Sequence, residues 1–449
     1  MVVTGTPHSL VTNRLLLKGL LDNTGPSWLV ATREKGLTEF ERTGIPTTKY
    51  EEWKYTSLRS LQEGDFKPAY GSNVFRTDLK GTLAESLETL TLAFVNGEYA
   101  PELNLEQPLP EGVVVTTLQE AFADHGGIIE RYLAKQAGCF EGKLGANLDA
   151  PFVHLNTAYL GEGAFVYVPA GIEVSEPIQL LFVSRADHGP FACHPRVLIV
   201  LEEGAHAKVL ETYQGIEGAY FTNAVTEIVV GSGATLEHTK IQMETPQAIH
   251  IATIECKQDA GSTLTSNNMT FGGSISRNDS NVWLNGERTE TWLNGIYVGK
   301  DAQVLDNHTR IDHAFPNCNS FEVYKGVLGD HAEGVFNGKI YVYEDAQKTD
   351  AKQTNQALLL SSTAQINTKP QLEIFADDVK CTHGATVGQI REDAKFYLRA
   401  RGIPEKQAEA LLVYAFAAEA LSRITIDSVS KALSKALYDK LGVASVLGD

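Results

Sequence analysis

The sequence predicts a mainly β protein with a parallel β-helix core, a mixed region of helix and strand before it and a helical domain after it. Two observations carry this prediction. Short β-rich runs separated by turn residues recur from about residue 152, and the pattern changes to helical spacing from about residue 393. The 449 residues accordingly divide into an N-terminal region 1–145, a β-helix core 146–390 and a C-terminal helical domain 391–449.

The N-terminal region shows signals for both helix and strand. The run SWLVATREKGLTEFERTG predicts a helix that ends at Gly44, because Pro46 follows closely. The run ESLETLTLAFVNGEYAPEL predicts a strand followed by an Asn-Gly turn.

The central region repeats a turn signal, then a small residue, then alternating side chains. These turns fall irregularly, a pattern typical of stacked rungs with insertions in their loops. Periodicity also allows a large β-sandwich or a cupin, in which turns and strands alternate as well. The turn positions are Gly163, Gly204, Gly233, Gly261, Asp301, His331, Asp345 and Thr363.

The C-terminal domain reads as two main helices. Pro404 and Glu405 predict the start of the first, and Asp427 or Ser428 predicts the N-cap of the second. The first helix carries an apolar stripe, which either caps one end of the solenoid or docks another protein. The stripe consists of Val413, Phe416, Ala417, Ala420, Leu421 and Ile424.

Charge and composition exclude several classes of partner. The net charge is −18, from 56 acidic and 38 basic residues, which argues against nonspecific binding to nucleic acid or to an anionic membrane. No apolar run is long enough for a membrane span. The five cysteines are widely spread without a CxxC pair, so free thiols in a reducing cytosol are expected.

The segment VKCTHGATVG places two metal-ligand types two residues apart. On a strand, Cys381 and His383 point to the same face, together with Val379, Ala385 and Val387. That face is apolar, so both residues are also explained as packing. Two ligands are too few for zinc or for an iron–sulfur cluster. Any remaining ligands must come from distant rungs or from another chain.

Other candidate residues favour structural roles. His308 and His313 are five residues apart, so a regular strand points them to opposite faces. Asp377 and Asp378 are adjacent, which opposes the paired acid and base of a sugar-cleaving β-helix enzyme. Asp312, Cys318 and His331 are further residues of ligand type. The sequence contains no GxSxG, HExxH or phosphate-binding GxxxxGK[ST] motif, so we expect no nucleotide bound by this chain.

Long segments resemble the SufD family of the SUF iron–sulfur cluster assembly machinery. They are EEWKYTSL, VFNGKIYV, KTDAKQTNQALLLSSTAQINTKPQLE, KPQLEIFADDVKCTHGATVGQI, FYLRARGI and YAFAAE. The related SufB proteins carry cysteine-rich motifs near the N-terminus and a glutamate after the corresponding histidine. Here the first cysteine is Cys139 and Gly384 follows His383, and both differences favour SufD.

The resemblance implies a right-handed parallel β-helix and a scaffold, not an enzyme, in the cytoplasm. It implies pairing with SufB and docking of the ATPase SufC on residues 391–449. Because exposed solenoid edges tend to pair, we also expect a homodimer when SufB is absent. It also implicates His383, with Cys381 as a second ligand or sulfur relay, in binding a transient iron–sulfur cluster shared with SufB. The apolar surroundings of this pair predict a site that is covered at rest and opened by SufC. The alternatives are a purely structural partner of SufB and, more remotely, a β-helix carbohydrate-active enzyme.

Overall fold

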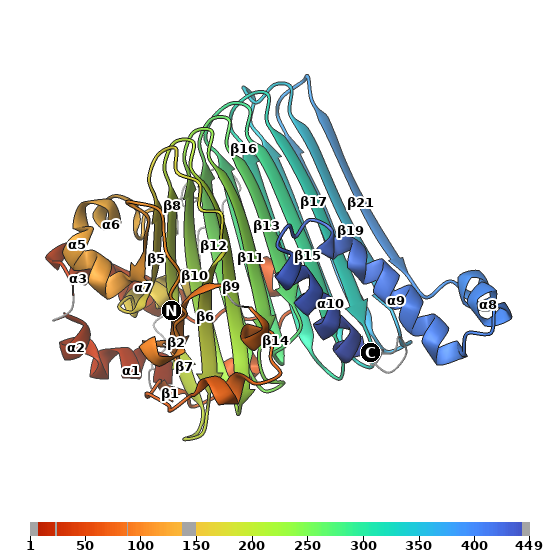
Figure 1. The fold of residues 1–449 in the computed structure, drawn as a ribbon, viewed down its shortest axis with the longest axis horizontal. Coiled ribbons are helices and arrows are strands. Elements are labelled where there is room, and N and C mark those ends of the chain that lie inside the picture. The colour runs from red at the N-terminus through yellow and green to blue at the C-terminus, as the bar shows by residue number, and fades with distance from the viewer. Residues whose placement is uncertain (1–7, 23–24, 88, 137–149, 442–449) are drawn as a thin grey trace.

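The computed structural model describes residues 8–22, 25–87, 89–136 and 150–441. Its core consists of two long parallel sheets, which the chain builds alternately, so that from β8 onward consecutive strands lie in opposite sheets (Figure 1). The mainly β fold and the parallel β-solenoid are confirmed. The right-handed sense of the coil stays an expectation from the resemblance, and the three domain boundaries stay predictions.

Sheet A forms one face of the solenoid. At its start β4 (Val114–Thr117) pairs antiparallel with β5, and the short strands β1 (Lys67–Pro68) and β7 (Phe191–Cys193) join it at β10. The parallel strands are β5 (Gly163–Val168), β8 (Arg196–Leu201), β10 (Tyr220–Val230), β12 (Ile249–Gln258), β14 (Ile275–Leu284), β16 (Val304–His313), β18 (Glu333–Val342) and β20 (Gln365–Ile374).

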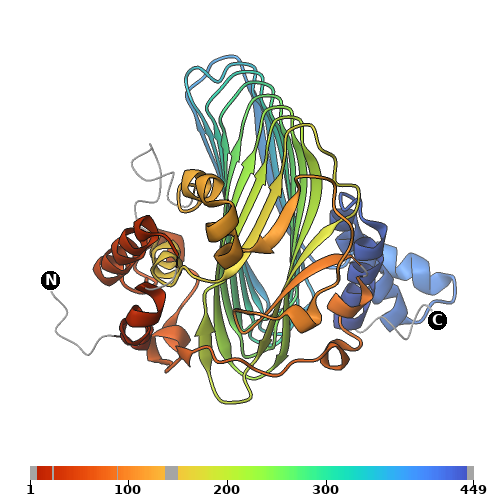
Figure 2. The same ribbon diagram turned by 60° about the vertical axis from the view of Figure 1, so that its left-hand side comes forward.

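Sheet B forms the opposite face, as Figure 2 shows. It begins with a hairpin of β2 (Leu90–Val95) and β3 (Glu98–Tyr99) around the predicted Asn-Gly turn. Its other strands are β6 (Ile178–Arg185), β9 (His206–Glu217), β11 (Thr235–Met243), β13 (Thr263–Thr270), β15 (Glu290–Gly299), β17 (Asn319–Leu328), β19 (Asp350–Leu359) and β21 (Lys380–Gly388).

The corners between the sheets explain the repeat in the sequence. Gly204, Gly233 and Gly261 turn the chain from sheet A to sheet B with φ of 65°, 67° and 68°, a conformation that favours glycine. The Gly204 amide donates to the Ser232 carbonyl of the next rung at 2.9 Å. These turns therefore stack as a ladder of their own.

The irregular spacing has a different cause from the one expected. Asp301, His331 and Thr363 lie at the opposite corner, from sheet B to sheet A, whereas Asp345 lies at the corner from A to B. Each rung thus contains two turns, one at each corner. The turn positions predicted from the sequence include turns of both corners in one series, and their spacing is therefore irregular. Loop insertions are not needed to explain it.

Inside the solenoid, glycines lie beside large aromatic side chains of the neighbouring strand. Gly295 lies beside Tyr324 in register, and a Cβ on Gly295 would meet the tyrosine ring at 2.2 Å. The same holds for Gly326 beside Tyr297, at 2.4 Å. Each ring therefore occupies the space over the neighbouring glycine, and the glycine fixes where the ring packs.

The N-terminal region flanks the first rungs and the outer face of sheet A. The helix predicted over SWLVATREKGLTEFERT is α3, with Gly44 as its C-cap. The helices of this region are α1 (Ser9–Leu16), α2 (Lys18–Asp22), α3 (Ser27–Thr43), α4 (Arg59–Glu63), α5 (Leu118–Asp124), α6 (Gly126–Tyr132) and α7 (Pro151–Ala158), with short 3-10 turns η1 (Glu51–Trp53), η2 (Arg76–Leu79), η3 (Ala84–Ser86) and η4 (Pro101–Leu103).

The EEWKYTSL segment is attached to sheet A by buried polar contacts. Arg277 stacks on the Trp53 ring at 3.8 Å and donates to the Glu52 carbonyl at 2.6 Å. The hydroxyl of Thr56 donates to Asp306 at 2.6 Å, and Arg277 reaches the same carboxylate at 2.9 Å. This motif therefore fixes the N-terminal region to the solenoid.

The three C-terminal helices are α8 (Glu392–Ala400), α9 (Glu405–Leu421) and α10 (Asp427–Leu441). Two of them, α9 and α10, cover sheet B, and the end of the solenoid stays uncovered by the described residues. The predicted stripe of α9, including Val413 and Ala417, packs with Ile296 and Val327 of the sheet, and α9 and α10 lie across its strands in Figure 1. The alternative in which these helices cap one end of the solenoid is therefore wrong.

Within the described residues, the helices are all too short or too polar to cross a lipid bilayer.

Candidate functional site

The predicted pair of ligand residues lies on the last rung of the solenoid. The strand β21 pairs with β19 alone among the described strands, so its second edge presents unpaired backbone groups. Cys381 stands beside Ala351 in register and His383 beside Gln353. The strand assignment for this segment is confirmed, and alternation places both side chains on the face that continues the solenoid interior.

The surroundings of this pair differ from the sequence-based expectation. His383 is exposed, Cys381 is half-buried, and Val387 is 46% exposed. The apolar face exists, but among the described residues no further rung covers it, and α9 and α10 pack elsewhere. Within the described part of the chain the site is therefore open.

Cys381 adjoins a small apolar cluster at the end of the core. Its neighbours include Ile340, Val342 and Ala351. Partial burial raises the pKa of the Cys381 thiol, because a thiolate loses hydration there. The thiol form is therefore favoured at neutral pH. A metal ion must displace the thiol proton before it can bind this sulfur.

A row of polar side chains leads inward from His383. Gln353 lies on the neighbouring strand and donates its Nε2 hydrogen bond to Glu322 Oε2 at 2.7 Å. Glu322 is next in register on β17. Burial raises the pKa of Glu322 to about 7, and both its Oε1 and the Gln353 Oε1 are buried without a hydrogen-bond partner. Gln353 thus lies between the exposed imidazole of His383 and the buried carboxyl of Glu322, which can carry a proton.

A second polar cluster lies deeper in the same interior. Glu211 accepts from His238 at 3.1 Å and from the Tyr213 hydroxyl at 2.6 Å. Lys240 contacts the His250 ring at 2.8 Å, and burial lowers the pKa of Lys240 to about 8. Leu293 and then Ser266 follow Glu322 in the row that leads to His238, so one apolar residue, Leu293, interrupts the otherwise polar row.

The two histidines predicted as further candidates have structural roles. His308 lies on the outer face of sheet A with the carboxylates of Glu52 and Asp306 at 3.3 and 3.0 Å. His313 lies inside and contacts the Ser320 hydroxyl at 2.8 Å. The opposite faces predicted for these histidines are confirmed.

The remaining candidates also lie apart from the terminal rung. Cys318 occupies a buried corner, where its thiol donates to the Gly286 carbonyl at 3.2 Å, and Asp312 holds Arg310 at 2.5 Å. His331 is exposed at the corner after β17. Asp377 and Asp378 lie on the exposed corner before β21, where Asp378 pairs with Lys348. Cys139 lies outside the described residues.

In the part of the chain that the structure describes, no three His, Cys, Asp or Glu side chains gather as metal ligands. The pair on β21 is therefore half of a site at most. Sequence reasoning missed Glu322 and Gln353 because they are common surface residue types. The rung repeat offered a signal, since His383, Gln353 and Glu322 follow one another at intervals of one rung.

Comparison with known proteins identifies the two main parts of the chain. Residues 182–416 match the family model described as the SUF system FeS cluster assembly, SufBD core domain. Residues 17–180 match the SufBD protein N-terminal region. Together the two models span most of the sequence.

Curated relatives are similar over nearly their whole length. An iron–sulfur cluster assembly SufBD family protein of Synechocystis is 32% identical over 92% of this chain and 91% of its own. The iron–sulfur cluster assembly protein SufD of Escherichia coli is 33% identical over 86% of this chain and 87% of its own. SufD of Bacillus subtilis is 27% identical over 93% and 94%.

Proposed function

The chain belongs to the SufBD family of the SUF iron–sulfur cluster assembly system, and from this premise we propose that it is a scaffold subunit. It pairs with SufB, binds the ATPase SufC, and contributes His383 to the nascent cluster, which is the cargo of the assembly. Cys381 is a second ligand or a sulfur relay. The chain itself binds no nucleotide and works in the reducing cytosol.

The observation that carries this proposal is the open terminal rung. Cys381 and His383 lie on an edge strand whose second edge is free within the described chain. Iron–sulfur clusters take ligands from several side chains, and this rung supplies two. A second chain that pairs with the rung brings its own ligands to the same place.

The end of the solenoid has the properties of a pairing surface for SufB. Apolar side chains there are exposed beside the free edges of β20 and β21, and burying them against a partner is favourable. They are Leu360 (38% exposed), Ile374 (39%), Phe375 (56%) and Val387 (46%). In the absence of SufB, a second copy of this chain uses the same edge.

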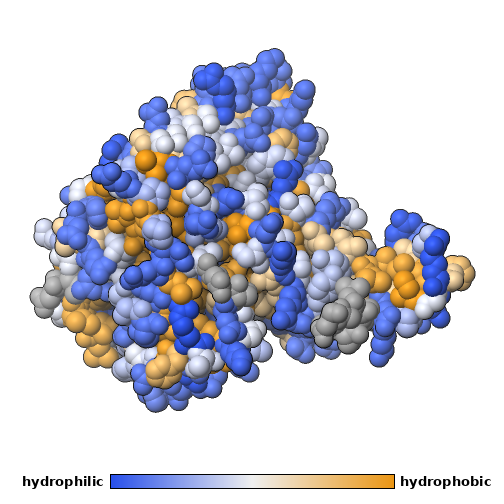
Figure 3. Space-filling model, viewed as in Figure 1, coloured by the Kyte–Doolittle hydropathy of each residue, from blue (hydrophilic) through white to orange (hydrophobic). Residues whose placement is uncertain are grey.

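The helix α8 is the proposed docking element for SufC. It projects from the body in Figure 1, and none of its residues is buried. Phe396 is 72% exposed and Tyr397 is 56% exposed, and hydrophobic surface gathers on this projecting end in Figure 3. Aromatic side chains of this kind anchor protein interfaces.

The C-terminal helices also provide a route from SufC to the site. Lys325 on β17 pairs with Glu419 on α9 and lies over the Phe416 ring at 4.6 Å. In the same sheet, β19 separates β17 from β21. Movement of α9 during ATP hydrolysis therefore acts on the sheet that carries the site, and opens the SufB contact that covers it at rest.

Co-production of the chain with SufB and SufC tests the proposal. We expect a complex that acquires iron and sulfide during reconstitution, and His383→Ala to lose most of both without losing either partner. Thr382→Ala is the matched control, because Thr382 is exposed on the opposite face of the same strand.

His383 is exposed, so His383→Ala should change the unfolding free energy by no more than about 0.5 kcal/mol. Wild-type cluster formation by both His383→Ala and Cys381→Ala would favour the purely structural partner of SufB. Activity of the isolated chain on a polysaccharide would favour the carbohydrate-active alternative.

A further inference from the structure

Gln353 is a buried amide that uses one of its hydrogen-bonding atoms and leaves the other open. Its side chain is 1% exposed, and its Nε2 donates to Glu322 Oε2 at 2.7 Å. Its Oε1 is buried and accepts no hydrogen bond from the described residues. An amide oxygen without a donor costs free energy in a protein interior, so a donor belongs beside it.

Packing fixes the position of this amide. A Cβ on Gly338, which lies on β18 of sheet A, would meet the Gln353 Nε2 at 2.2 Å, so the nitrogen occupies the space over that glycine. While Glu322 accepts from the same nitrogen, the oxygen remains the free atom of the amide.

The next polar residue on the same face of β19 has both of its amide atoms in use. Asn355 donates its Nδ2 to Thr368 at 3.0 Å, and its Oδ1 accepts from the Tyr297 hydroxyl at 3.1 Å. Of the two buried amides on this face of the strand, Gln353 is therefore the one with an atom left to accept.

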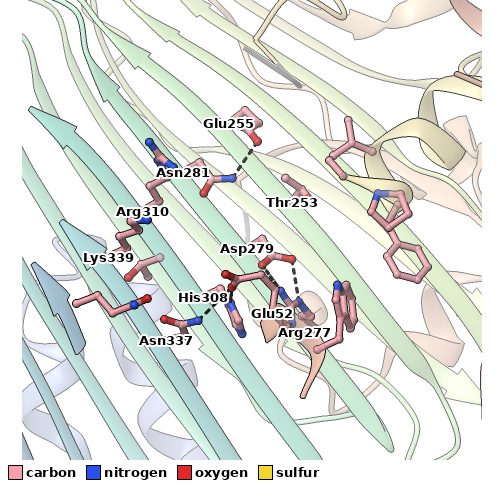
Figure 4. A pocket seen from close by; sticks show the side chains of 17 residues that line it. Glu52, Thr253, Glu255, Arg277, Asp279, Asn281, His308, Arg310, Asn337 and Lys339 are labelled. Carbon is pink, nitrogen blue, oxygen red and sulfur yellow. Dashed lines mark hydrogen bonds and ion pairs between the residues drawn. The ribbon is translucent and has the colours of Figure 1, made fainter. Parts of the chain in front are cut away.

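Charged side chains in the pocket on the outer face of sheet A, by contrast, satisfy one another. Figure 4 shows Arg277 and Asp279 joined in this pocket, beside Glu52 and His308. The lining cations pair with carboxylates of the same or the neighbouring strand. The pairs are Arg277 with Asp279, Arg310 with Asp312 and Lys339 with Glu373, at 2.8, 2.5 and 2.6 Å. Their charges are thus neutralised within the chain.

His383 stands where a donor to Gln353 is needed. The two residues are partners in the register of β19 and β21, and paired strands lie about 4.8 Å apart. Both side chains are long enough to bridge this gap with a hydrogen bond of normal length. The imidazole is exposed, so it is free to turn its ring toward the amide.

We propose that Gln353 is the positioning residue of His383. The Nδ1–H of the imidazole donates to Gln353 Oε1, which leaves Nε2 without a proton as the atom that binds iron. The hydrogen bond made by one ring nitrogen decides which nitrogen is the ligand. Glu322 acts one step further in, because it holds the amide that receives this bond. The inference rests on the proposed function, since it concerns the same cluster ligand.

The position of His383 on an edge strand explains why such support matters. An exposed side chain samples several rotamers, and fixing it in one of them for a metal costs conformational entropy. A ring that Gln353 already holds loses less freedom when the cluster binds, and it meets the iron with one defined nitrogen.

Nuclear magnetic resonance of the imidazole nitrogens measures the tautomer in the isolated full chain, without any cluster. The histidines are isotope-labelled, and the His383 signal is identified by its loss in His383→Ala. At a pH of about 8, where an ordinary imidazole is neutral, we expect the Nδ1–H tautomer to dominate. Gln353→Met keeps the length of the side chain but removes the acceptor, so it should shift the population toward Nε2–H.

Gln356→Met is the matched control for this measurement. Gln356 lies on the same strand and faces the other way, so the same substitution there should leave the tautomer of His383 unchanged. Far-ultraviolet dichroism checks that each variant is folded. If Gln353→Met does not fold, Glu322→Leu provides the test, because loss of its carboxyl frees the Gln353 amide to turn and should also lower the Nδ1–H population.

Reconstitution of the complex with SufB and SufC gives a second readout. Gln353→Met should retain both partners and bind iron roughly tenfold more weakly, the order expected when the hydrogen-bond partner of a ligating histidine is removed. Gln356→Met should bind iron as the wild type does.

The two measurements separate this inference from the proposed function. Equal tautomer populations in the wild type and in the folded Gln353 or Glu322 variant would overturn the positioning role and leave the proposed function standing. Wild-type cluster content in His383→Ala would overturn the proposed function, and the positioning role with it, even where the tautomer shifts as expected.

Discussion

Gln353 stands directly beside His383 in the register of β19 and β21, and its amide donates to the buried Glu322 carboxyl at 2.7 Å. The exposed face of the terminal rung is thus joined to the solenoid interior by one side chain. The imidazole is exposed, while the glutamine beside it in register is held from within. The Glu322 carboxyl and the open edge of β21 can be tested separately.

The Glu322 carboxyl should make stability depend on pH. Its pKa in the folded chain is about 7, above the usual value for a glutamate carboxyl, so the folded state binds the proton more tightly than the unfolded state. The free energy of unfolding therefore falls as pH rises from about 4.5 to about 7, by an amount on the order of 3 kcal/mol.

Urea denaturation of wild type and Glu322→Gln across this pH range measures the effect. The variant should lose less stability with rising pH than the wild type. Because other carboxyls titrate in both proteins, the difference between the two curves is the quantity to compare. Superimposable pH profiles would show that Glu322 is ionised in the folded chain at pH 6.

Cys381 should be the most reactive of the four described cysteines in the isolated chain. Cys193, Cys256 and Cys318 are buried, whereas Cys381 is half-buried on the open rung. Labelling with iodoacetamide and peptide mapping should find Cys381 modified first, and faster at alkaline pH because its pKa is raised.

The same labelling tests the covered site. Binding of SufB should protect Cys381, and ATP should restore its reactivity in the complex with SufC. Equal labelling of Cys381 with and without ATP would exclude the proposed opening.

The free edge of β21 should be required for pairing. Lys380 donates its amide to Thr349 at the junction with β19, and successive residues of a parallel strand direct their amides to alternate sides. Ala385 therefore directs its amide toward the open edge. Ala385→Pro should leave the isolated chain folded but weaken binding to SufB by tenfold or more.

Ala385→Ser is the matched control, because it keeps the amide. Light scattering and calorimetry on both variants separate a pairing defect from a folding defect. Wild-type affinity of the proline variant would place the interface elsewhere.

The aromatic residues of α8 should contribute to SufC binding and little to stability. Phe396→Ala removes a side chain that is 72% exposed, so the melting temperature should stay within about 2 °C of wild type. Affinity for SufC should fall by at least tenfold, as expected for an aromatic anchor.

Val413→Ala provides the contrast. Val413 is buried against sheet B, so its truncation should cost about 1–3 kcal/mol of stability by leaving a cavity and should not directly remove the SufC contact. Pull-down assays and thermal melts on both variants test this. An unchanged affinity for SufC in Phe396→Ala would contradict the assignment of α8.

The sequence by itself determined the elements and the direction of their side chains. Turn residues and two-residue alternation predicted the rungs, helical spacing predicted α9 and its stripe, and alternation placed Cys381 and His383 on one face. All of these depend on local backbone geometry, which neighbouring residues specify. The ligand types on β21 were visible for the same reason.

Only the tertiary structure decided what surrounds those residues. The sequence of a strand with one apolar face is the same whether or not another rung covers that face. The exposure of His383 therefore depends on β21 being the last described strand of its sheet. The contact of Gln353 with Glu322 joins side chains a full rung apart in the chain. Their positions follow from how the rungs stack in register, and burial by that stacking raises the pKa of Glu322.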